Sequence, residues 1–343
     1  MRRVLIFRLL LACIILTILN ILPGCNQESG QKQVVVYTAV DQVFSEPVFR
    51  EFEKQIGIQV LAVYDVEAAK TTGLVNRLIA ESSRPKADVF WSNEYAQSII
   101  LKEKGILAPY ASASAIDIPE QYRDPEHFWT GFAARARVII VNTSLVYENE
   151  YPHSIFDLSD PSWKDEVGIA KPLFGTTATH AAALFAYLGD SGAQNYFQSL
   201  LNNNVHIVDG NSVVRDMVVS GELKCGLTDT DDAFVAMENG DPIKMIFPDQ
   251  QYMGTLLIPN TVGLIKGAPH PDAARQFIDY LLSKETEKAL AYSSSRNIPL
   301  RADVPTPGDL LGFTEIKFMN VLPQDVAAKM GKSSTWLQQY FFR

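Results

Sequence analysis

The feature that most constrains the fold of this chain is an alternation of strand-like and helix-like segments that begins near residue 33. The segment QVVVYTAVDQVFSEPVFREFEKQIGIQVLAVYD contains a β-branched apolar run, a helical stretch and a second apolar run. Ser45 is a candidate N-cap for the helix and Gly57 a candidate end. A strand that continues through a crossover helix into another strand is typical of a parallel sheet.

The same alternation returns along most of the chain. It continues through the segments TTGLVNRLIAES, KADVFWS, YAQSIILKEKGIL, ARARVIIVNTSLV, VGIAKP, THAAALFAYLG, NNVHIVDG, VVRDMVVSGE, KCGLTDTD and TVGLIKG. With 343 residues, 47% of them hydrophobic, the chain has enough apolar material for two cores. We therefore predict an α/β fold with two lobes, each a mostly parallel sheet flanked by helices.

The N-terminal segment predicts export. Arg2, Arg3 and Arg8 flank a long apolar stretch within residues 1–24, which is typical of a secretory signal. The sequence LPGC that ends at Cys25 resembles a lipobox, so we predict that Cys25 is lipidated and that residues 25–33 form a tether. A plain signal peptide and an uncleaved anchor helix are the alternatives. We expect the mature chain on a membrane, at its periplasmic or cell-surface face.

Charge and cysteine content narrow the possible partners. The net charge of −9 includes three arginines and no acid within residues 1–24, so the remainder carries −12. This sign argues against nucleic acid as a partner. If Cys13 is removed and Cys25 is lipidated, Cys225 remains alone and no intramolecular disulfide forms.

Five loops that follow predicted strands are the expected ligand loops. In open parallel sheets, ligands bind beyond the carboxyl ends of the strands, where loops and helix N-termini meet. The loops that meet this condition are residues 38–42, 92–95, 175–180, 210–213 and 228–232. We expect them to surround one cleft.

The order of several motifs resembles that of the periplasmic solute-binding proteins of ABC importers, in the group that includes ferric-ion-binding proteins. The motifs are VVVYTA, EFEKQIGIQV, RPKADVFWSNE, RARVIIVNT, DGNSVV, VVSGELKCGLTD and APHPDAARQFIDYLLSKE, between about residue 34 and beyond residue 300. The resemblance implies a two-lobed (type II) binding protein without enzymatic activity or a required cofactor. It implies a small solute as ligand and a permease in the inner membrane as partner. We expect a monomer.

The resemblance also implies a division into lobes. The first lobe would hold residues 34–131 and about 257–310. The second would hold residues 132–256, and we assign residues 311–343 to it as well.

Ferric-binding relatives offer a histidine, a glutamate and a tyrosine pair to iron, and the corresponding positions differ here. They are Asp41, Asn93 with Glu94 beside it, and the pair Asp231 and Asp232. Carboxylates suit hard cations, so Asp41, Glu94, Asp231 and Asp232 are candidate ligands for Fe³⁺, Ca²⁺, Mg²⁺ or Mn²⁺. The phenolate ligands of ferric relatives are absent from these positions.

An anion site is predicted at the start of the helical segment GTTATH. Backbone N–H groups and the hydroxyls of Thr176 and Thr177 would face an anion at the positive end of the helix dipole. The resemblance adds Asn211 and Arg135 to this site. In ferric relatives such a site holds a small synergistic anion, so the default ligand is ferric iron together with a bound anion.

The cluster Asp229, Asp231 and Asp232 has two interpretations. Acids at the start of a helix commonly cap it, and this accounts for one or two of them. A third acid at the mouth of a cleft indicates a cationic partner, so we expect at least one to face the ligand. We expect the acids and the anion loop on opposite walls. A zwitterion such as an aminoalkylphosphonate would bridge the same two walls and is the alternative to iron.

Some further residues have weaker signals. His180, Tyr37, Trp91 and Asn260 could each face the cleft, but packing accounts for them equally simply. Carboxylate pairs can act as acid and base, so a secreted hydrolase is a remote alternative. The chain contains no G-x-S-x-G, H-E-x-x-H or P-loop motif.

Overall fold

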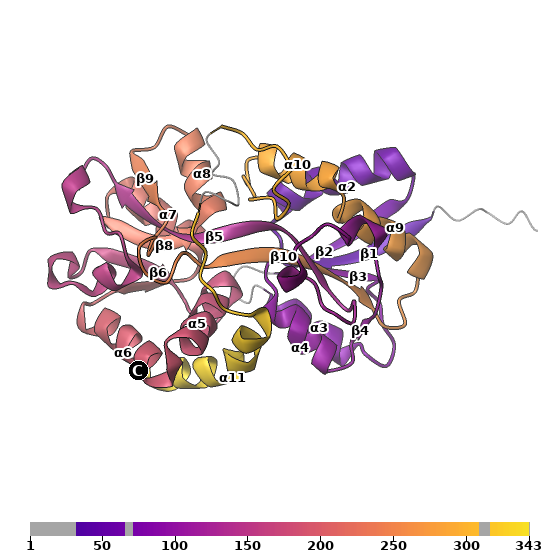
Figure 1. Ribbon diagram of the computed structural model, residues 1–343, viewed down its shortest axis with the longest axis horizontal. Helices are drawn as coiled ribbons and strands as arrows, with labels where there is room; N and C mark the ends of the chain where they lie inside the picture. The colour runs from indigo at the N-terminus through magenta and orange to yellow at the C-terminus, as the bar shows by residue number, and fades with distance from the viewer. Residues whose placement is uncertain (1–31, 66–70, 309–315, 343) are drawn as a thin grey trace, which may run out of the picture. The chain divides into compact units, whose positions relative to one another are not determined.

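The computed structural model describes residues 32–65, 71–308 and 316–342, and its strands join into one mixed sheet (Figure 1). The strand order is β2-β1-β3-β10-β5-β8-β6-β7, with β4 paired to β10 and β9 paired to β5. The strands are β1 (Gln33–Thr38), β2 (Gln59–Tyr64), β3 (Val89–Ser92), β4 (Leu107–Ala108), β5 (Thr130–Asn142), β6 (Val167–Ala170), β7 (His206–Val208), β8 (Cys225–Asp229), β9 (Ile243–Ile246) and β10 (Leu257–Ile265). The signal segment, the tether and Cys25 lie outside the described residues, apart from the last two tether positions.

Strand β5 belongs to two halves of this sheet. Its first part pairs antiparallel with β10, from Thr130 to Ala136, and its second part pairs antiparallel with β8 and β9, from Arg137 to Asn142. We call β1, β2, β3, β4 and β10 the β1 half-sheet, and β6, β7, β8 and β9 the β8 half-sheet. All thirteen residues of β5 are buried, so the shared strand lies in the interior.

The parallel arrangement predicted from the alternation holds for β1, β2 and β3 and for β6, β7 and β8, whereas β4 and β9 pair antiparallel with β10 and β5. Strand β1 pairs parallel with β2 and β3, and β6 pairs parallel with β7 and β8. The central strands differ from this expectation, because β10 runs antiparallel to both β3 and β5. Strand β10 and its neighbours β3 and β5 are not joined by simple crossover helices, so nothing forces these strands to be parallel.

Helices cover both faces of the sheet (Figure 1). The α-helices are α2 (Gln42–Ile56), α3 (Thr72–Ala80), α4 (Ala96–Glu103), α5 (Gly175–Tyr187), α6 (Gly189–Asn202), α7 (Asn211–Ser220), α8 (Thr230–Glu238), α9 (Pro271–Leu281), α10 (Lys284–Tyr292) and α11 (Pro323–Tyr340). Short 3₁₀ turns occur at Ala113–Ala115, Glu120–Tyr122, Glu148–Glu150, Ile155–Ser159 and Pro161–Trp163. One apolar core holds side chains of α3, α4, α5, α6 and α11, and a second holds those of α2, α7, α8, α9 and α10.

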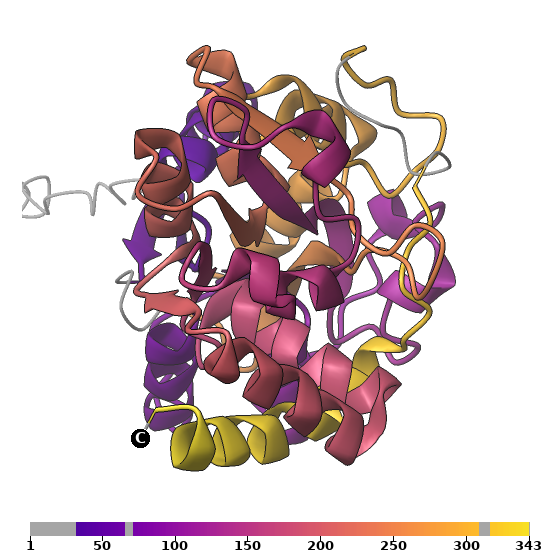
Figure 2. The ribbon, with the colours of Figure 1, turned by 90° about the vertical axis from the view of Figure 1, so that its left-hand side faces the viewer.

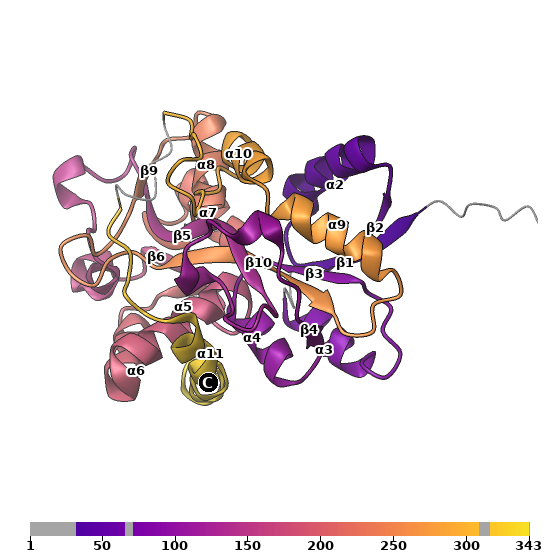
Figure 3. The same cartoon turned by 45° about the vertical axis from the view of Figure 1, so that its right-hand side comes forward.

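Helix α2 begins earlier than predicted. It starts at Gln42 with Asp41 at the N-cap position, and Ser45 lies inside it, where its hydroxyl donates to the carbonyl of Asp41. The predicted end at Gly57 is confirmed, since this residue has φ +76°, a conformation that favours glycine. Helix α2 lies beside α9 (Figure 3). Its apolar stripe packs on that helix, with the ring centroids of Phe52 and Phe277 5.0 Å apart.

The C-terminal helix α11 lies against α5, α4 and α6 (Figure 2). Trp336 contacts Phe185 of α5, and Lys329 forms an ion pair with Asp190 of α6 at 3.0 Å. Helix α11 therefore contacts helices from both predicted lobes, and the assignment of residues 311–343 to the second lobe stays a prediction. Across the described ranges, no helix is both long enough and apolar enough to cross a membrane.

Candidate functional site

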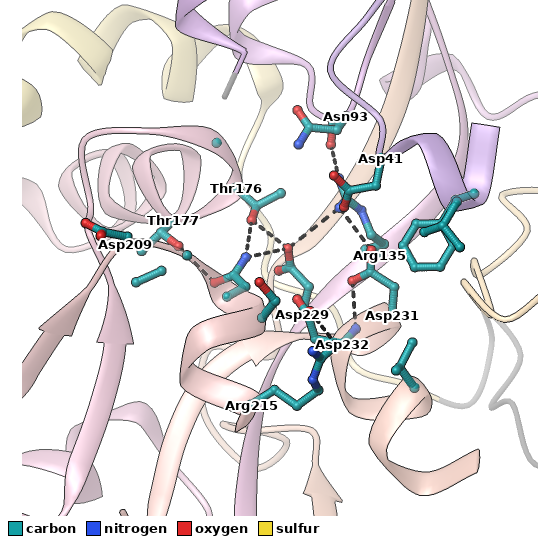
Figure 4. A pocket seen from close by; sticks show the side chains of 18 of the residues that line it. Asp41, Asn93, Arg135, Thr176, Thr177, Asp209, Arg215, Asp229, Asp231 and Asp232 are labelled. Carbon is teal, nitrogen blue, oxygen red and sulfur yellow. Dashed lines mark hydrogen bonds and ion pairs between the residues drawn. The ribbon is translucent and has the colours of Figure 1, made fainter. Parts of the chain in front are cut away.

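A cavity of about 530 Å³ lies where the ligand loops meet (Figure 4). Nine of the ten residues predicted to bind a ligand line it, and only Glu94 does not. The nine are Asp41, Asn93, Arg135, Thr176, Thr177, Asn211, Asp229, Asp231 and Asp232. Both half-sheets contribute, because Asp41 and Asn93 follow β1 and β3 whereas the threonines and Asp229 follow β6 and end β8. The sequence therefore located the cavity, and the ligand-binding roles of these residues stay predictions.

The carboxylate of Asp229 is the centre of a buried hydrogen-bond network. Asp229 is 1% exposed, and its Oδ1 accepts from Arg137 Nη1 at 2.7 Å. Its Oδ2 accepts from the Thr176 hydroxyl at 2.6 Å and from Asn211 Nδ2 at 2.9 Å. Burial alone would raise the pKa of Asp229, but the guanidinium groups of Arg137 and Arg135 and the Thr176 hydroxyl together lower it.

This network corrects the expectation that the acids and the anion loop lie on opposite walls. Thr176 and Asn211, which were expected to hold an anion, donate to the carboxylate of Asp229. The reason is topological: β6 and β8 are neighbouring parallel strands, so the loops at their carboxyl ends are adjacent. The negative charge that these donors face is supplied by the protein itself.

Arg135 connects the two sides of the cavity. Its Nη1 donates to Asp231 Oδ2 at 3.2 Å and lies 3.8 Å from Asp229 Oδ2. Its Nη2 donates to the backbone carbonyl of Asn93, in the loop after β3. Burial would lower the pKa of Arg135, but the carboxylates of Asp231, Asp229 and Asp41 raise it, so the guanidinium stays charged.

The third aspartate has an arginine of its own. Arg215 Nη1 lies 3.5 Å from Asp232 Oδ1, and the same carboxylate accepts from the Thr228 hydroxyl at 3.3 Å. Arg215 lines the cavity together with Lys171. Sequence reasoning did not identify Arg137, Arg215 or Lys171. Arg137 could have been found, since it lies two residues from Arg135 on one strand and so shares its face.

The three aspartates are close enough to share a cation. Asp229, Asp231 and Asp232 each offer a carboxylate oxygen, and these oxygens lie within 4.8 Å of one another. Such a set of oxygens has the chemistry of a hard-cation site.

Glu94 has a structural position, and its assignment as a metal ligand is corrected. Its Oε2 accepts from the backbone N–H of Ala96 at 2.6 Å and from the Thr179 hydroxyl at 2.9 Å, and its Oε1 accepts from the N–H of Gln97. Burial raises the pKa of Glu94, an effect that outweighs these hydrogen bonds. The carboxylate therefore satisfies the first turn of α4 instead of facing the cavity.

The residues with weaker signals pack within the protein. Trp91 packs against Phe49, with ring centroids 5.6 Å apart, and the Tyr37 hydroxyl donates to Glu81 at 3.0 Å. Asn260 hydrogen-bonds to Asn297 at 2.9 Å, beside a side pocket of the cavity. None of these three lines the main cavity.

His180 lies behind the cavity wall, in the second turn of α5. It is 4% exposed and borders a small apolar pocket that also contains Tyr196. Burial, followed by the charge of Arg137, lowers its pKa to about 3, so the imidazole is neutral near pH 7. The packed interpretation of His180 agrees with this position.

Most of the described chain matches a known protein family. The model of the bacterial extracellular solute-binding proteins matches residues 84–327, most of the described chain. The chain belongs to this family. Its members are binding proteins of importers, and the predicted resemblance and two-lobed α/β fold are confirmed.

Several similar proteins are named for the solutes that they take up or bind. The chain is 27% identical to iron uptake protein A1 of Synechocystis over 86% of this chain and 83% of that protein. It is 25% identical to the Fe(3+)-binding periplasmic protein of Serratia marcescens, over 78% of each. It is 26% identical to a putative 2-aminoethylphosphonate-binding periplasmic protein of Salmonella typhimurium, over 86% of each.

Solved structures of other binding proteins share the fold. Iron-bound HitA from Pseudomonas aeruginosa matches with a TM-score of 0.81 and 24% identity, over 89% of this chain and 99% of that one. AfuA from Actinobacillus pleuropneumoniae, with exogenous fructose-6-phosphate bound, matches with a TM-score of 0.80 and 21% identity, over 91% and 100%. The same fold thus holds solutes of very different chemistry in these two structures.

Proposed function

We propose that this protein is the substrate-binding component of an ABC importer. It captures a small solute in the cavity between the half-sheets and delivers it to a permease in the inner membrane. The observation that carries this proposal is a ligand-sized cavity lined from both half-sheets by loops at strand ends. The protein acts by binding alone, as a monomer, and catalyses no reaction.

We further propose that the two lobes close on the solute. The first lobe comprises residues 34–131 and about 257–310, and the second comprises residues 132–256 and 311–343. The change of pairing partner within β5 supports a passage between lobes along this strand, because the strand leaves β10 and joins β8 near Ala136, beyond the proposed boundary at residue 131. Closure excludes water from the cavity and thereby strengthens each polar contact to the solute.

Ferric iron with a synergistic anion is the first candidate solute. Two of the compared relatives are named for iron, and the oxygens of Asp229, Asp231 and Asp232 lie within 4.8 Å of one another. These three aspartates, with Asp41 across the cavity, are the proposed ligands. Thr177 and the backbone N–H groups at the start of α5 remain the proposed donors to the anion, since Thr176 and Asn211 donate to Asp229.

An aminoalkylphosphonate or a similar zwitterion is the second candidate. The specific observation that favours it is the lining itself, which contains both acidic and basic side chains and, among the described residues, no tyrosine. Lys171 and Arg215 would face the acidic end of such a solute, and Asp41 would face its amine. A cavity of about 530 Å³ also accommodates an organic molecule.

One experiment separates these candidates. The protein is purified from cells without added ligand and analysed for metals and by native mass spectrometry. A stoichiometric metal with ferric absorbance supports iron, and a small organic mass without metal supports the zwitterion. If neither ferric citrate nor 2-aminoethylphosphonate nor any extracted solute binds in calorimetry, the proposal of a solute-binding role is rejected.

Export and anchoring need a separate test. We propose that Cys25 carries the lipid that holds the protein to a membrane, as the lipobox-like sequence indicates. Wild type should partition into the membrane fraction and incorporate labelled palmitate. Cys25→Ala should lose both properties, and unchanged labelling of that variant would reject lipidation at Cys25.

A further inference from the structure

The three aspartates of the cavity are matched by three arginines. Asp229 pairs with Arg137 at 2.7 Å, Asp231 with Arg135 at 3.2 Å and Asp232 with Arg215 at 3.5 Å. We call these six residues the paired cluster. Since every carboxylate has a guanidinium within ion-pair distance, the paired cluster carries no net charge.

We propose that the paired cluster prevents tight binding of metal ions in the cavity. The solute of the cavity is an organic molecule that presents acceptor oxygens and carries no net positive charge. Arg135 is the residue that sets this specificity. The inference rests on the proposed importer function, because it concerns the solute of the same cavity, and it decides between the two candidate solutes in favour of the organic one over ferric iron.

The position of Arg135 carries the first step. Its Nη1 lies 3.2 Å from Asp231 and 3.8 Å from Asp229, so a guanidinium nitrogen already lies beside two of the three carboxylates that a shared metal ion would use. A hard cation there would repel this buried positive charge. Moving Arg135 away would also break its hydrogen bond to the carbonyl of Asn93 and leave a buried charge without its partner.

The hydrogen-bond inventory carries the second step. Arg135 is 7% exposed, and its Nε–H has no partner among the described residues. Arg135 lines both the main cavity and a side pocket of about 10 Å³ that it shares with Asp41 and Trp91. A buried donor in a cavity wall calls for an acceptor oxygen, from the solute or from a water in the side pocket, and a metal ion cannot supply one.

Terbium(III) is a suitable probe, because it is a hard cation that prefers oxygen ligands and luminesces when bound. We expect wild type to bind terbium weakly. Arg135→Leu removes the guanidinium from between the carboxylates and should bind terbium at least tenfold more tightly. Arg50→Leu is the matched control, since Arg50 lies on the exposed face of α2 with 70% of its side chain accessible. This variant should bind terbium as wild type does.

Two further variants protect the test against misfolding. Asp231→Asn in the Arg135→Leu background should cancel the gain, because it removes one of the freed carboxylates. Arg215→Leu, at a partly exposed position, replaces the Arg135 variant in the test if that variant does not fold. It should give a smaller gain in terbium affinity than Arg135→Leu. Circular dichroism and thermal unfolding verify the fold of each variant.

The outcomes distinguish this inference from the proposed function. Equal terbium affinity in wild type and a folded Arg135→Leu variant overturns the inference, as does stoichiometric iron in the purified wild type. Either result leaves the importer role intact. An organic mass in wild type together with the gain in Arg135→Leu supports both proposals.

Discussion

The two sides of the cavity are built differently. The β8 half-sheet supplies a buried network in which Asp229 accepts hydrogen bonds from Arg137, Thr176 and Asn211. The β1 half-sheet supplies Asp41 and Asn93 together with the apolar side chains of two α2 residues, Val43 and Phe44. One side is thus organised before a solute arrives, and the other is suited to cover it. We expect the solute to dock on the β8 side first.

The strongest test of this comparison removes the centre of the network. Asp229→Asn leaves Arg137 buried without its charged partner, which should lower the free energy of unfolding by about 3–5 kcal/mol. Solute affinity should fall by roughly a hundredfold, or about 2.7 kcal/mol. Urea unfolding and calorimetry measure the two effects.

The matched control is Asp209→Asn, since Asp209 also lines the cavity but its side chain is 83% accessible. It should change stability little. An equally small effect of Asp229→Asn would show that the network does not organise the β8 side.

Acid should weaken the β8 side through His180. The buried imidazole has a pKa of about 3, below its ordinary value of about 6.5, so its contribution to stability is present above pH 6.5 and is lost as pH falls. Between pH 7 and pH 4.5 this group alone should reduce the free energy of unfolding by about 2.5 kcal/mol.

Urea titrations at the two pH values, on wild type and His180→Gln, measure this difference. The variant should show a smaller loss than wild type by about that amount. His206→Gln, at an exposed histidine of β7, serves as control and should keep the wild-type pH dependence. Identical pH dependence in all three proteins contradicts the assignment.

Removing the partner of Arg135 should have an intermediate effect. Asp231→Ala deletes the carboxylate that orients Arg135 and should weaken solute binding about tenfold, or about 1.4 kcal/mol. Cys225→Ala, in the buried part of the same β8 strand and loop region, should leave affinity unchanged. Calorimetry with the solute extracted from the protein makes the comparison, and equal affinities of wild type and Asp231→Ala would reject a binding role for this acid.

The smallest effect is expected on the β1 side. Asp41 is the acidic residue that this side contributes to the cavity lining, and it lies at the N-cap position of α2. Asp41→Asn retains a good capping residue and should weaken binding about threefold, or about 0.7 kcal/mol. A loss as large as that of Asp229→Asn would mean that the two sides contribute equally.

The fold could be predicted because each element has a local signal. The run QVVVYT forms β1, the apolar spacing of Val48, Phe49 and Phe52 gives α2 its buried stripe, and Gly57 ends that helix. The rule that ligands bind at strand ends then located the cavity. The antiparallel centre could not be predicted, because the pairing of β5 with β10 joins residues more than a hundred positions apart and has no local signature.

The sequence predicted which residues line the cavity but not which of them hydrogen-bond to one another. Thr176, Asn211 and Asp229 were each identified, yet their mutual hydrogen bonds depend on the spatial order of β6, β7 and β8. Glu94 was predicted to bind the ligand but does not line the cavity. A carboxylate after a strand suits a ligand and a helix cap equally, and only the position of its neighbours Ala96 and Thr179 decides between them.

The change of partner within β5 has a mechanical consequence. Arg135 lies on the last stretch held by β10, and Arg137 is the first residue held by β8. A twist of the strand at Ala136 would therefore move one guanidinium relative to the other and alter how both grip Asp229. Bending of the backbone and rearrangement of the ion pairs would then occur together, so the conformation of β5 at Ala136 would differ between the empty and the filled cavity.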